Sequence, residues 1–261
     1  MSMRSSRSVG ATLSLLLALA LAACGGEAAE RSASERAEPG ASATPAAERR
    51  SAAPTPSTEP AEAPRTVLFL GTSLTAGYGV APEQAYPALI QAKIDSAGLP
   101  YRVVNAGVSG ETSAGALRRS EWLLKQPFDV LVLETGANDM LRGMDLDSTR
   151  ANLQHILDRV RAERPDAVIV LEGMMAPPNL GGAYTRAFQQ IYPELAEENG
   201  VPLVPFLLEG VAGERALNLA DGIHPNAAGQ RRVAETVWAT LGPVLEKRRD
   251  SGSGIRDSGG M

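Results

Sequence analysis

The sequence is poor in cysteine, histidine and aromatic residues, and neither sign of charge dominates it. It has one cysteine, which excludes an internal disulfide, and two histidines, too few with that cysteine to form a structural zinc site. Its 25 basic and 30 acidic residues leave a net charge of -5, which gives no basic surface for nucleic acid. Any chemistry that depends on histidine therefore has two candidates, His155 and His224.

The remaining composition is that of a globular chain. The hydrophobic fraction of 44% and the charged fraction of 21% exclude a collagen, a coiled coil and a wholly disordered protein. A length of 261 residues allows one sizeable α/β domain or two small ones. These residues are unevenly distributed, which indicates how the chain is organised.

The N-terminus has the pattern of an export signal. Arg4 and Arg7 precede an apolar run over 9–23 that is short for a membrane span. The run ends in Leu-Ala-Ala before Cys24, which resembles the bacterial lipobox, where cleavage precedes a cysteine whose thiol carries a diacylglyceryl group. We expect residues 1–23 to be a lipoprotein signal peptide and Cys24 to be lipidated. A free cysteine behind an ordinary signal is the alternative. A lipidated Cys24 would anchor an exported protein to a membrane, facing the periplasm or the cell exterior.

Two further segments lack the residues of a folded core. From 25 to 65 the chain is Ala, Pro, Ser, Thr, Glu, Arg and Gly without Leu, Ile, Val or aromatic residues, so it cannot bury enough apolar area to offset its ordering entropy. We expect residues 24–65 to be a lipidated, disordered linker and the Ser/Gly-rich residues 249–261 to be a disordered tail. The predicted folded domain is 66–248.

Within that domain, short apolar runs alternate with segments of helical period, which is typical of βαβ units and a parallel sheet covered on both faces. Right-handed crossovers then favour a three-layer α/β/α sandwich. The predicted strands are 67–70, 102–105, 130–134, 167–171 and 203–205, and the predicted helices are 86–96, 114–124, 148–161, 184–198 and 226–245. Ligands of such sheets bind beyond the carboxyl ends of the strands, so the residues after each strand are the candidates for a site.

Three of these post-strand loops carry polar residues beside glycine: Gly71–Gly77 with Ser73, Asn105–Thr112 with Gly110, and Glu134–Asp139 with Asn138. A serine at a strand-to-helix turn can be a nucleophile but is more often a helix cap. Glycines let backbone amides approach a ligand, and an asparagine amide can donate to an oxyanion. Each loop taken alone is also ordinary turn chemistry.

The segment Asp221-Gly222-Ile223-His224-Pro225 is the most informative. An aspartate three residues before a histidine can reach Nδ1–H, fix the tautomer and leave Nε2 free to accept a proton. A surface turn with a capping aspartate is the alternative. His155 is predicted within a helix, away from any strand end, and we interpret it as structural or exposed.

Together the segments GTSLTAGYG, NAGVSGETSAGALRR, LETGANDMLRG and DGIHPNAAG resemble, in order, the SGNH (GDSL) hydrolase superfamily, and in particular its thioesterase I, lysophospholipase and arylesterase subgroup. The resemblance implies a flavodoxin-like, five-stranded parallel sheet in the order 2-1-3-4-5. It implies a catalytic triad with Ser73 as nucleophile, His224 as base and Asp221 as the orienting carboxylate. It places the oxyanion hole at the N–H groups of Ser73 and Gly110 and the amide of Asn138.

In one position the chain departs from the family pattern, because Thr72 stands where the namesake Gly-Asp-Ser-Leu block has aspartate. That aspartate is not a triad member, and a threonine can still hydrogen-bond neighbouring backbone. The block from Met174 to Leu180 resembles the wall of the family's acyl crevice, with simple core packing as the alternative.

The resemblance implies an ester hydrolase without metal or organic cofactor that acts on small ester or lipid substrates, with thioesters as a further substrate class. We expect it to be a monomer. A carbohydrate O-acetylesterase of the cell envelope, and a lipid-anchored binding protein with a vestigial site, are the competing interpretations.

Overall fold

The computed structural model describes residues 63–253. The chain divides into two units, 1–57 and 58–261, and the described residues belong to the second. The predictions of a signal peptide, of a lipidated Cys24, of the linker as far as residue 62 and of the tail from residue 254 lie outside the described residues. The linker was predicted to reach residue 65, whereas Arg65 already begins the first strand.

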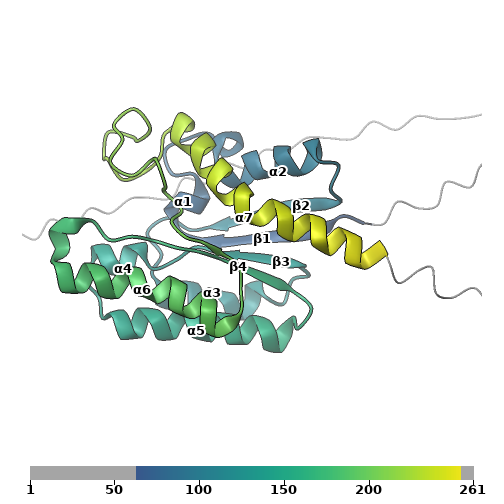
Figure 1. Ribbon diagram of the computed structural model, residues 1–261, viewed down its shortest axis with the longest axis horizontal. Coiled ribbons are helices and arrows are strands. Elements are labelled where there is room, and N and C mark those ends of the chain that lie inside the picture. Colours follow the sequence, from purple (N-terminus) through teal and green to yellow (C-terminus); the bar gives the residue numbers. More distant parts are fainter. Residues whose placement is uncertain (1–62, 254–261) are drawn as a thin grey trace, which may run out of the picture. The chain divides into compact units, whose positions relative to one another are not determined.

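A five-stranded parallel sheet forms the middle layer (Figure 1). Its strands follow the order β2-β1-β3-β4-β5, which confirms the predicted topology. Their bounds are β1 Arg65–Gly71, β2 Tyr101–Gly107, β3 Val130–Leu133, β4 Val168–Glu172 and β5 Leu203–Val204. The strand order reverses between β1 and β3, so the crevice above their carboxyl ends is where this fold places a ligand.

Helices cover both faces of the sheet: α2 and α7 lie on one side, and α3, α5 and α6 lie on the other (Figure 1). The three-layer α/β/α prediction is therefore confirmed. The helices are α1 Ser73–Ala76, α2 Tyr86–Ser96, α3 Ser113–Leu123, α4 Ala137–Leu141, α5 Leu146–Glu163, α6 Gly182–Asn199 and α7 Ala227–Ser253, with short 3₁₀ turns η1 Pro82–Gln84 and η2 Pro178–Leu180.

The last helix is longer than predicted. The prediction followed the apolar period, which ends at the buried Leu245, whereas α7 continues to Ser253 and so includes the first residues of the predicted tail. The residues that follow Leu245, Glu-Lys-Arg-Arg, are good helix formers without being apolar. Helix propensity thus extends α7 beyond the part that packs.

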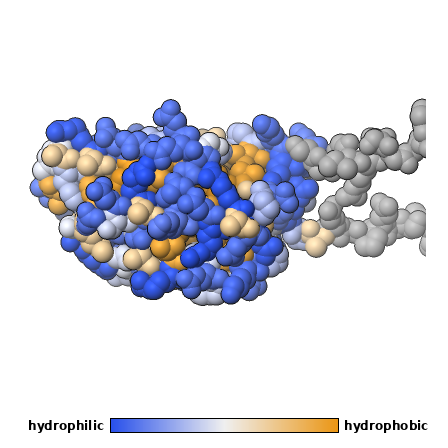
Figure 2. All heavy atoms as spheres, turned by 90° about the horizontal axis from the view of Figure 1, so that it is seen from below, coloured by the Kyte–Doolittle hydropathy of each residue, from blue (hydrophilic) through white to orange (hydrophobic). Residues whose placement is uncertain are grey.

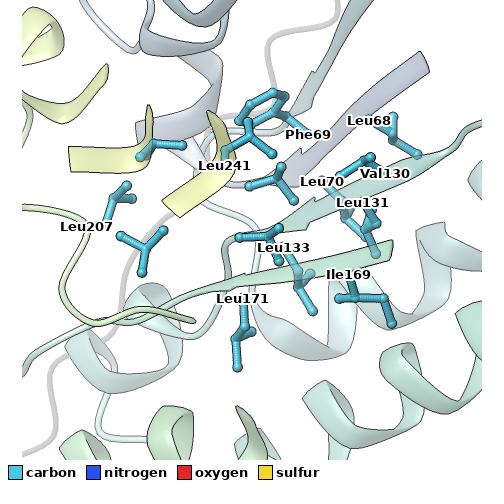
Figure 3. Close-up of a cluster of buried hydrophobic side chains, with 14 of the residues drawn as sticks. Leu68, Phe69, Leu70, Val130, Leu131, Leu133, Ile169, Leu171, Leu207 and Leu241 are labelled. Atoms are coloured by element: carbon cyan, nitrogen blue, oxygen red, sulfur yellow. The ribbon is translucent and has the colours of Figure 1, made fainter. Parts of the chain in front are cut away.

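The core explains why this sheet is a rigid platform. All four residues of β3 are buried, as expected for a strand covered on both faces. Figure 3 shows strand side chains clustered with Leu207 and Leu241, which belong to the loop after β5 and to α7. Side chains in such a core are closely packed, which holds the strand ends and the loops after them in place.

The face shown in Figure 2 is mostly hydrophilic, with apolar side chains in separate areas. In the stretch 63–253, no helix has the length and apolar character needed to cross a membrane.

Candidate active site

Ser73 begins α1, immediately after the end of β1. Two glycines allow this short helix to end sharply and to pack close to the sheet. At Gly77, which ends the helix, φ is 72°, a left-handed conformation that favours glycine. A Cβ at Gly107 would lie 2.2 Å from the Ala76 nitrogen, so glycine at the end of β2 lets α1 approach the sheet closely. The serine side chain is thereby carried to the carboxyl edge of the sheet.

His224 lies in a loop that several backbone contacts hold. Leu219 N–H donates to the His224 carbonyl at 2.7 Å, and a β-bridge joins Asn218 to Pro225. The Asn226 side chain accepts from the N–H groups of residues 228 and 229 and so caps the start of α7. Both ends of this loop are therefore anchored on either side of the histidine.

The structure brings together the three residues predicted to form the triad. His224 Nδ1 lies 2.7 Å from Asp221 Oδ2, and His224 Nε2 lies 2.9 Å from Ser73 Oγ. The Tyr78 ring lies against the imidazole, with ring centroids 4.5 Å apart. His155 is exposed on α5, as its predicted place in a helix indicated.

Hydrogen bonds hold Asp221 in its ionised form. The backbone N–H groups of His224 and Ile223 donate to Oδ1, at 3.0 Å and 2.9 Å, while the histidine ring contacts Oδ2. These donors, the His224 N–H first, lower the pKa of Asp221 to about 2. A carboxylate at this position keeps the proton on Nδ1 and leaves Nε2 as the acceptor that faces Ser73.

Of the predicted oxyanion-hole residues, Asn138 lies at the cavity that Ser73 lines, and Gly110 belongs to the loop that Asn138 contacts. Within residues 63–253, the N–H groups of Ser73 and Gly110 donate to no acceptor. Asn138, in the first turn of α4, lines a cavity together with Ser73, and its amide donates to the Glu111 carbonyl at 2.9 Å. This bond joins Asn138 to the Gly110 loop and leaves the second amide hydrogen available for a ligand.

A cavity of about 530 Å³ opens beside Ser73 and His224. Most of its wall is apolar, with side chains from α4, from the loop after β4 and from the loop after β5: Met140, Leu141, Met174, Met175, Ala176, Pro177, Phe206 and Leu208. The block after β4 was predicted to form either a crevice wall or core. It does both, since Met174 is buried in the core cluster and also lines the cavity.

Beneath the turn that carries Ser73 lies a buried polar network that sequence reasoning missed. The sequence suggested neighbouring backbone as the partner of the Thr72 hydroxyl. In the structure this hydroxyl instead donates to the Glu134 carboxylate at 2.8 Å. Thr75 also donates to Glu134, and Tyr86 bonds both Thr75 and Glu172. The signal that could have revealed it is a glutamate at the end of each of two wholly apolar strands, since a buried carboxylate needs partners.

Burial raises the pKa of both glutamates, that of Glu172 to about 8. In the same part of the chain, residues 63–253, no three His, Cys, Asp or Glu side chains are grouped to hold a metal ion.

A serine hydroxyl that contacts a histidine, itself oriented by a carboxylate, at the carboxyl edge of a 2-1-3-4-5 sheet is the arrangement typical of serine hydrolases of the α/β/α class. Residues 69–232 match the GDSL-like Lipase/Acylhydrolase family, and the chain belongs to this family. It is accordingly a hydrolase of carboxylic esters.

Curated relatives match over most of their length. Esterase TesA of Pseudomonas aeruginosa is 44% identical over 184 residues, which are 70% of this chain and 90% of that protein. Thioesterase 1/protease 1/lysophospholipase L1 of Escherichia coli K12 is 41% identical over 187 residues, 71% of this chain and 87% of that protein. The crystal structure of TesA superposes with a TM-score of 0.66 at 43% identity, and covers 69% of this chain and 99% of its own.

Proposed function

We propose that the chain hydrolyses esters of apolar acyl groups at Ser73, with the acyl group held in the cavity beside it. The observation that carries this proposal is the continuity of the Ser73–His224 pair with a cavity of about 530 Å³ whose wall is mainly apolar. A pocket of this size is typical of small-molecule sites, and the few polar groups at its edge are those that acyl transfer needs.

The geometry supports a two-stage reaction. His224 Nε2 takes the Ser73 proton while the serine oxygen attacks the ester carbonyl, and the resulting oxyanion faces the N–H groups of Ser73 and Gly110 and the Asn138 amide. Asp221 stabilises the imidazolium. His224 then returns the proton to the departing alcohol, which leaves an acyl-enzyme. Water, deprotonated by the same nitrogen, attacks that ester, and the acid departs as the proton returns to Ser73.

The cavity wall favours substrates with a hydrocarbon acyl group. Met174 and Met175 adapt to varied apolar shapes, and the exposed Leu141, Met175 and Ile223 extend the apolar lining to the cavity mouth. A relative whose name includes lysophospholipase is consistent with this class. Thioesters react by the same steps, but an exported enzyme would meet esters and lysophospholipids rather than acyl-CoA.

A series of p-nitrophenyl esters from acetyl to dodecanoyl tests the proposal. Each buried methylene contributes about 0.8 kcal/mol, so we expect kcat/KM to rise about fourfold per methylene until the cavity is full. An optimum at acetyl would instead favour the O-acetylesterase interpretation, and no turnover of any ester would favour the binding-protein interpretation.

A pair of matched variants localises the acyl site. Leu208 lines the cavity and is half-buried, so Leu208→Trp should fill part of it and move the optimum to shorter chains. Leu117 is a half-buried leucine of α3 that does not line the cavity. Leu117→Trp should leave the optimum unchanged, and an equal shift in both variants would refute the assignment of the acyl group to this cavity.

We further propose that the mature protein begins at a lipidated Cys24 and is anchored to a membrane at the periplasmic side or cell exterior. The support is the small-residue sequence before Cys24, after an apolar run of export length. Intact-mass analysis of the membrane fraction tests it: a diacylglyceryl group on an N-terminal Cys24 is expected, and an unmodified thiol or another cleavage site would refute it. Cys24→Ser should abolish the modification.

A further inference from the structure

Two glutamates lie buried beneath the turn that carries Ser73. Glu134 directly follows β3 and Glu172 ends β4, so both stand at the carboxyl edge of adjacent strands, and neither is exposed to solvent. Tyr86, from α2 on one face of the sheet, is fully buried between them in a chain of hydrogen bonds. None of these three side chains touches the substrate cavity.

The number of hydrogen atoms shared by these hydrogen-bonded side chains shows that one carboxyl group is protonated. Thr75 Oγ1 lies 2.9 Å from Glu134 Oε2 and 2.9 Å from the Tyr86 hydroxyl, which lies 2.8 Å from Glu172 Oε2. Three such contacts need three hydrogens, and the hydroxyls of Thr75 and Tyr86 supply only two. The third must be a proton on the carboxyl group at one end of the chain.

The surroundings of the two carboxyl groups decide which end holds that proton. Glu134 Oε2 accepts the Thr72 N–H at 2.7 Å and Oε1 accepts the Thr72 hydroxyl at 2.8 Å, so a negative charge there is well solvated by the protein. Glu172 Oε1 has no partner, which a neutral acid tolerates far better than a carboxylate. The charge therefore resides on Glu134 and the proton on Glu172, in agreement with a Glu172 pKa of about 8.

We propose that the Glu134 carboxylate is a positioning residue for the nucleophile: it holds the N–H and hydroxyl of Thr72, and thereby Ser73, while a proton kept on Glu172 completes the chain that supports it. The proposal rests on the proposed function of Ser73. The placement of reacting atoms matters at this scale, since a displacement of about 1 Å can lower a rate about 100-fold.

Neighbouring residues fit this role. A Cβ at Gly71 would lie 1.9 Å from Thr75 Oγ1 and 2.8 Å from Glu134 Oε2, so glycine is needed there to leave room for the network. The other titratable side chains that face Glu134 are Tyr86 from α2, Glu172 from β4 and Tyr192 from α6, and burial raises the pKa of all three. None of them supplies a positive charge, which leaves the Thr72 and Thr75 donors to stabilise the Glu134 carboxylate.

Four substitutions in the full chain test the proposal. Glu134→Gln places an amide NH₂ group where the carboxylate accepted hydrogen bonds from Thr72 and Thr75. Thr72→Val removes the hydroxyl but keeps the shape of the side chain. Both should lower kcat about 10- to 100-fold and slow the labelling of Ser73 by a fluorophosphonate, with KM within about twofold of the wild-type value. Thr72→Ser retains the donor and should restore kcat. Thr66→Val is the matched control, because Thr66 is a buried threonine at the opposite end of β1.

The outcomes separate the two levels of inference. An unchanged kcat in Glu134→Gln, whether or not KM is raised, would overturn the positioning role. A Thr72→Val variant no slower than Thr66→Val would overturn it too, and this comparison remains available if Glu134→Gln does not fold. Ser73→Ala addresses the proposed function itself: full activity in that variant would refute the nucleophile, whereas an inactive Ser73→Ala beside a fully active Glu134→Gln would refute only the positioning role.

Discussion

Glu172→Gln should change how the stability of the protein depends on pH. The carboxyl group is fully buried, and its pKa is raised from 4.5 to about 8, chiefly by desolvation, then by the charge of Glu134. Between these two pH values the unfolded chain releases the Glu172 proton while the folded chain retains it. The free energy of unfolding of the wild type therefore falls as pH rises from about 4.5 to about 8, and the contribution of this group is constant outside that window.

The size of the effect follows from the same two values. At about 1.36 kcal/mol per pH unit, the loss amounts to about 3 kcal/mol at pH 7 and about 4 kcal/mol at pH 8, and it levels off at about 5 kcal/mol above pH 8. A glutamine is neutral throughout and can donate to the Tyr86 hydroxyl as the protonated acid does, so the variant lacks this term. Its second amide hydrogen lacks an acceptor, which lowers stability by about 1–3 kcal/mol at every pH. The test is therefore how the difference in unfolding free energy between wild type and Glu172→Gln changes with pH, and not the size of that difference at any one pH.

Urea unfolding at half-unit steps from pH 5 to pH 9, followed by circular dichroism, measures the difference between wild type and variant. Glu121→Gln is the control, because that side chain is 68% exposed and should leave the pH dependence unchanged. Parallel curves for the wild type and Glu172→Gln from pH 5 to pH 8 would show that Glu172 holds no proton in the folded state. That result would also contradict the proposal that a proton on Glu172 completes the hydrogen bonds between Glu172, Tyr86, Thr75 and Glu134.

Three further predictions concern the site and its boundaries. Ser73→Ala and His224→Ala should each lower kcat by roughly 10⁴–10⁶-fold, and the double variant should be little worse because triad members act as a unit. His155→Ala should keep wild-type turnover, and an equal loss in that variant would refute the assignment of His224 as the base. Asn138→Ala should lower kcat by roughly 10²–10³-fold with a smaller change in KM, whereas a raised KM at constant kcat would make it a substrate-binding residue. A chain that starts at Pro64 should hydrolyse short, water-soluble esters at the full-length rate, and a large loss would show that earlier residues contribute to the fold or the site.

Much of the fold could be predicted because its signals are local. The helix predicted over 86–96 has the same bounds as α2, since its start and its period are contained in the segment itself. The short helices α1 and α4 were not predicted, because four or five residues show no hydrophobic period. Asp221 and His224 could be paired in advance, because three residues on a tight turn bring their side chains into reach.

The sequence by itself determined the order of the strands along the chain, the loops that follow them, and the residue types of the triad and oxyanion hole. Only the tertiary structure decided what those loops meet. Ser73 and His224 are 151 positions apart, and the parallel sheet brings them within 2.9 Å by aligning its carboxyl ends. The partner of Thr72 was likewise invisible, because Glu134 lies 62 positions away, and so was the partner of Glu172, because Tyr86 lies 86 positions away. Hydrogen bonds over such separations leave no periodicity in a sequence, since they depend on which strands become neighbours when the core is buried.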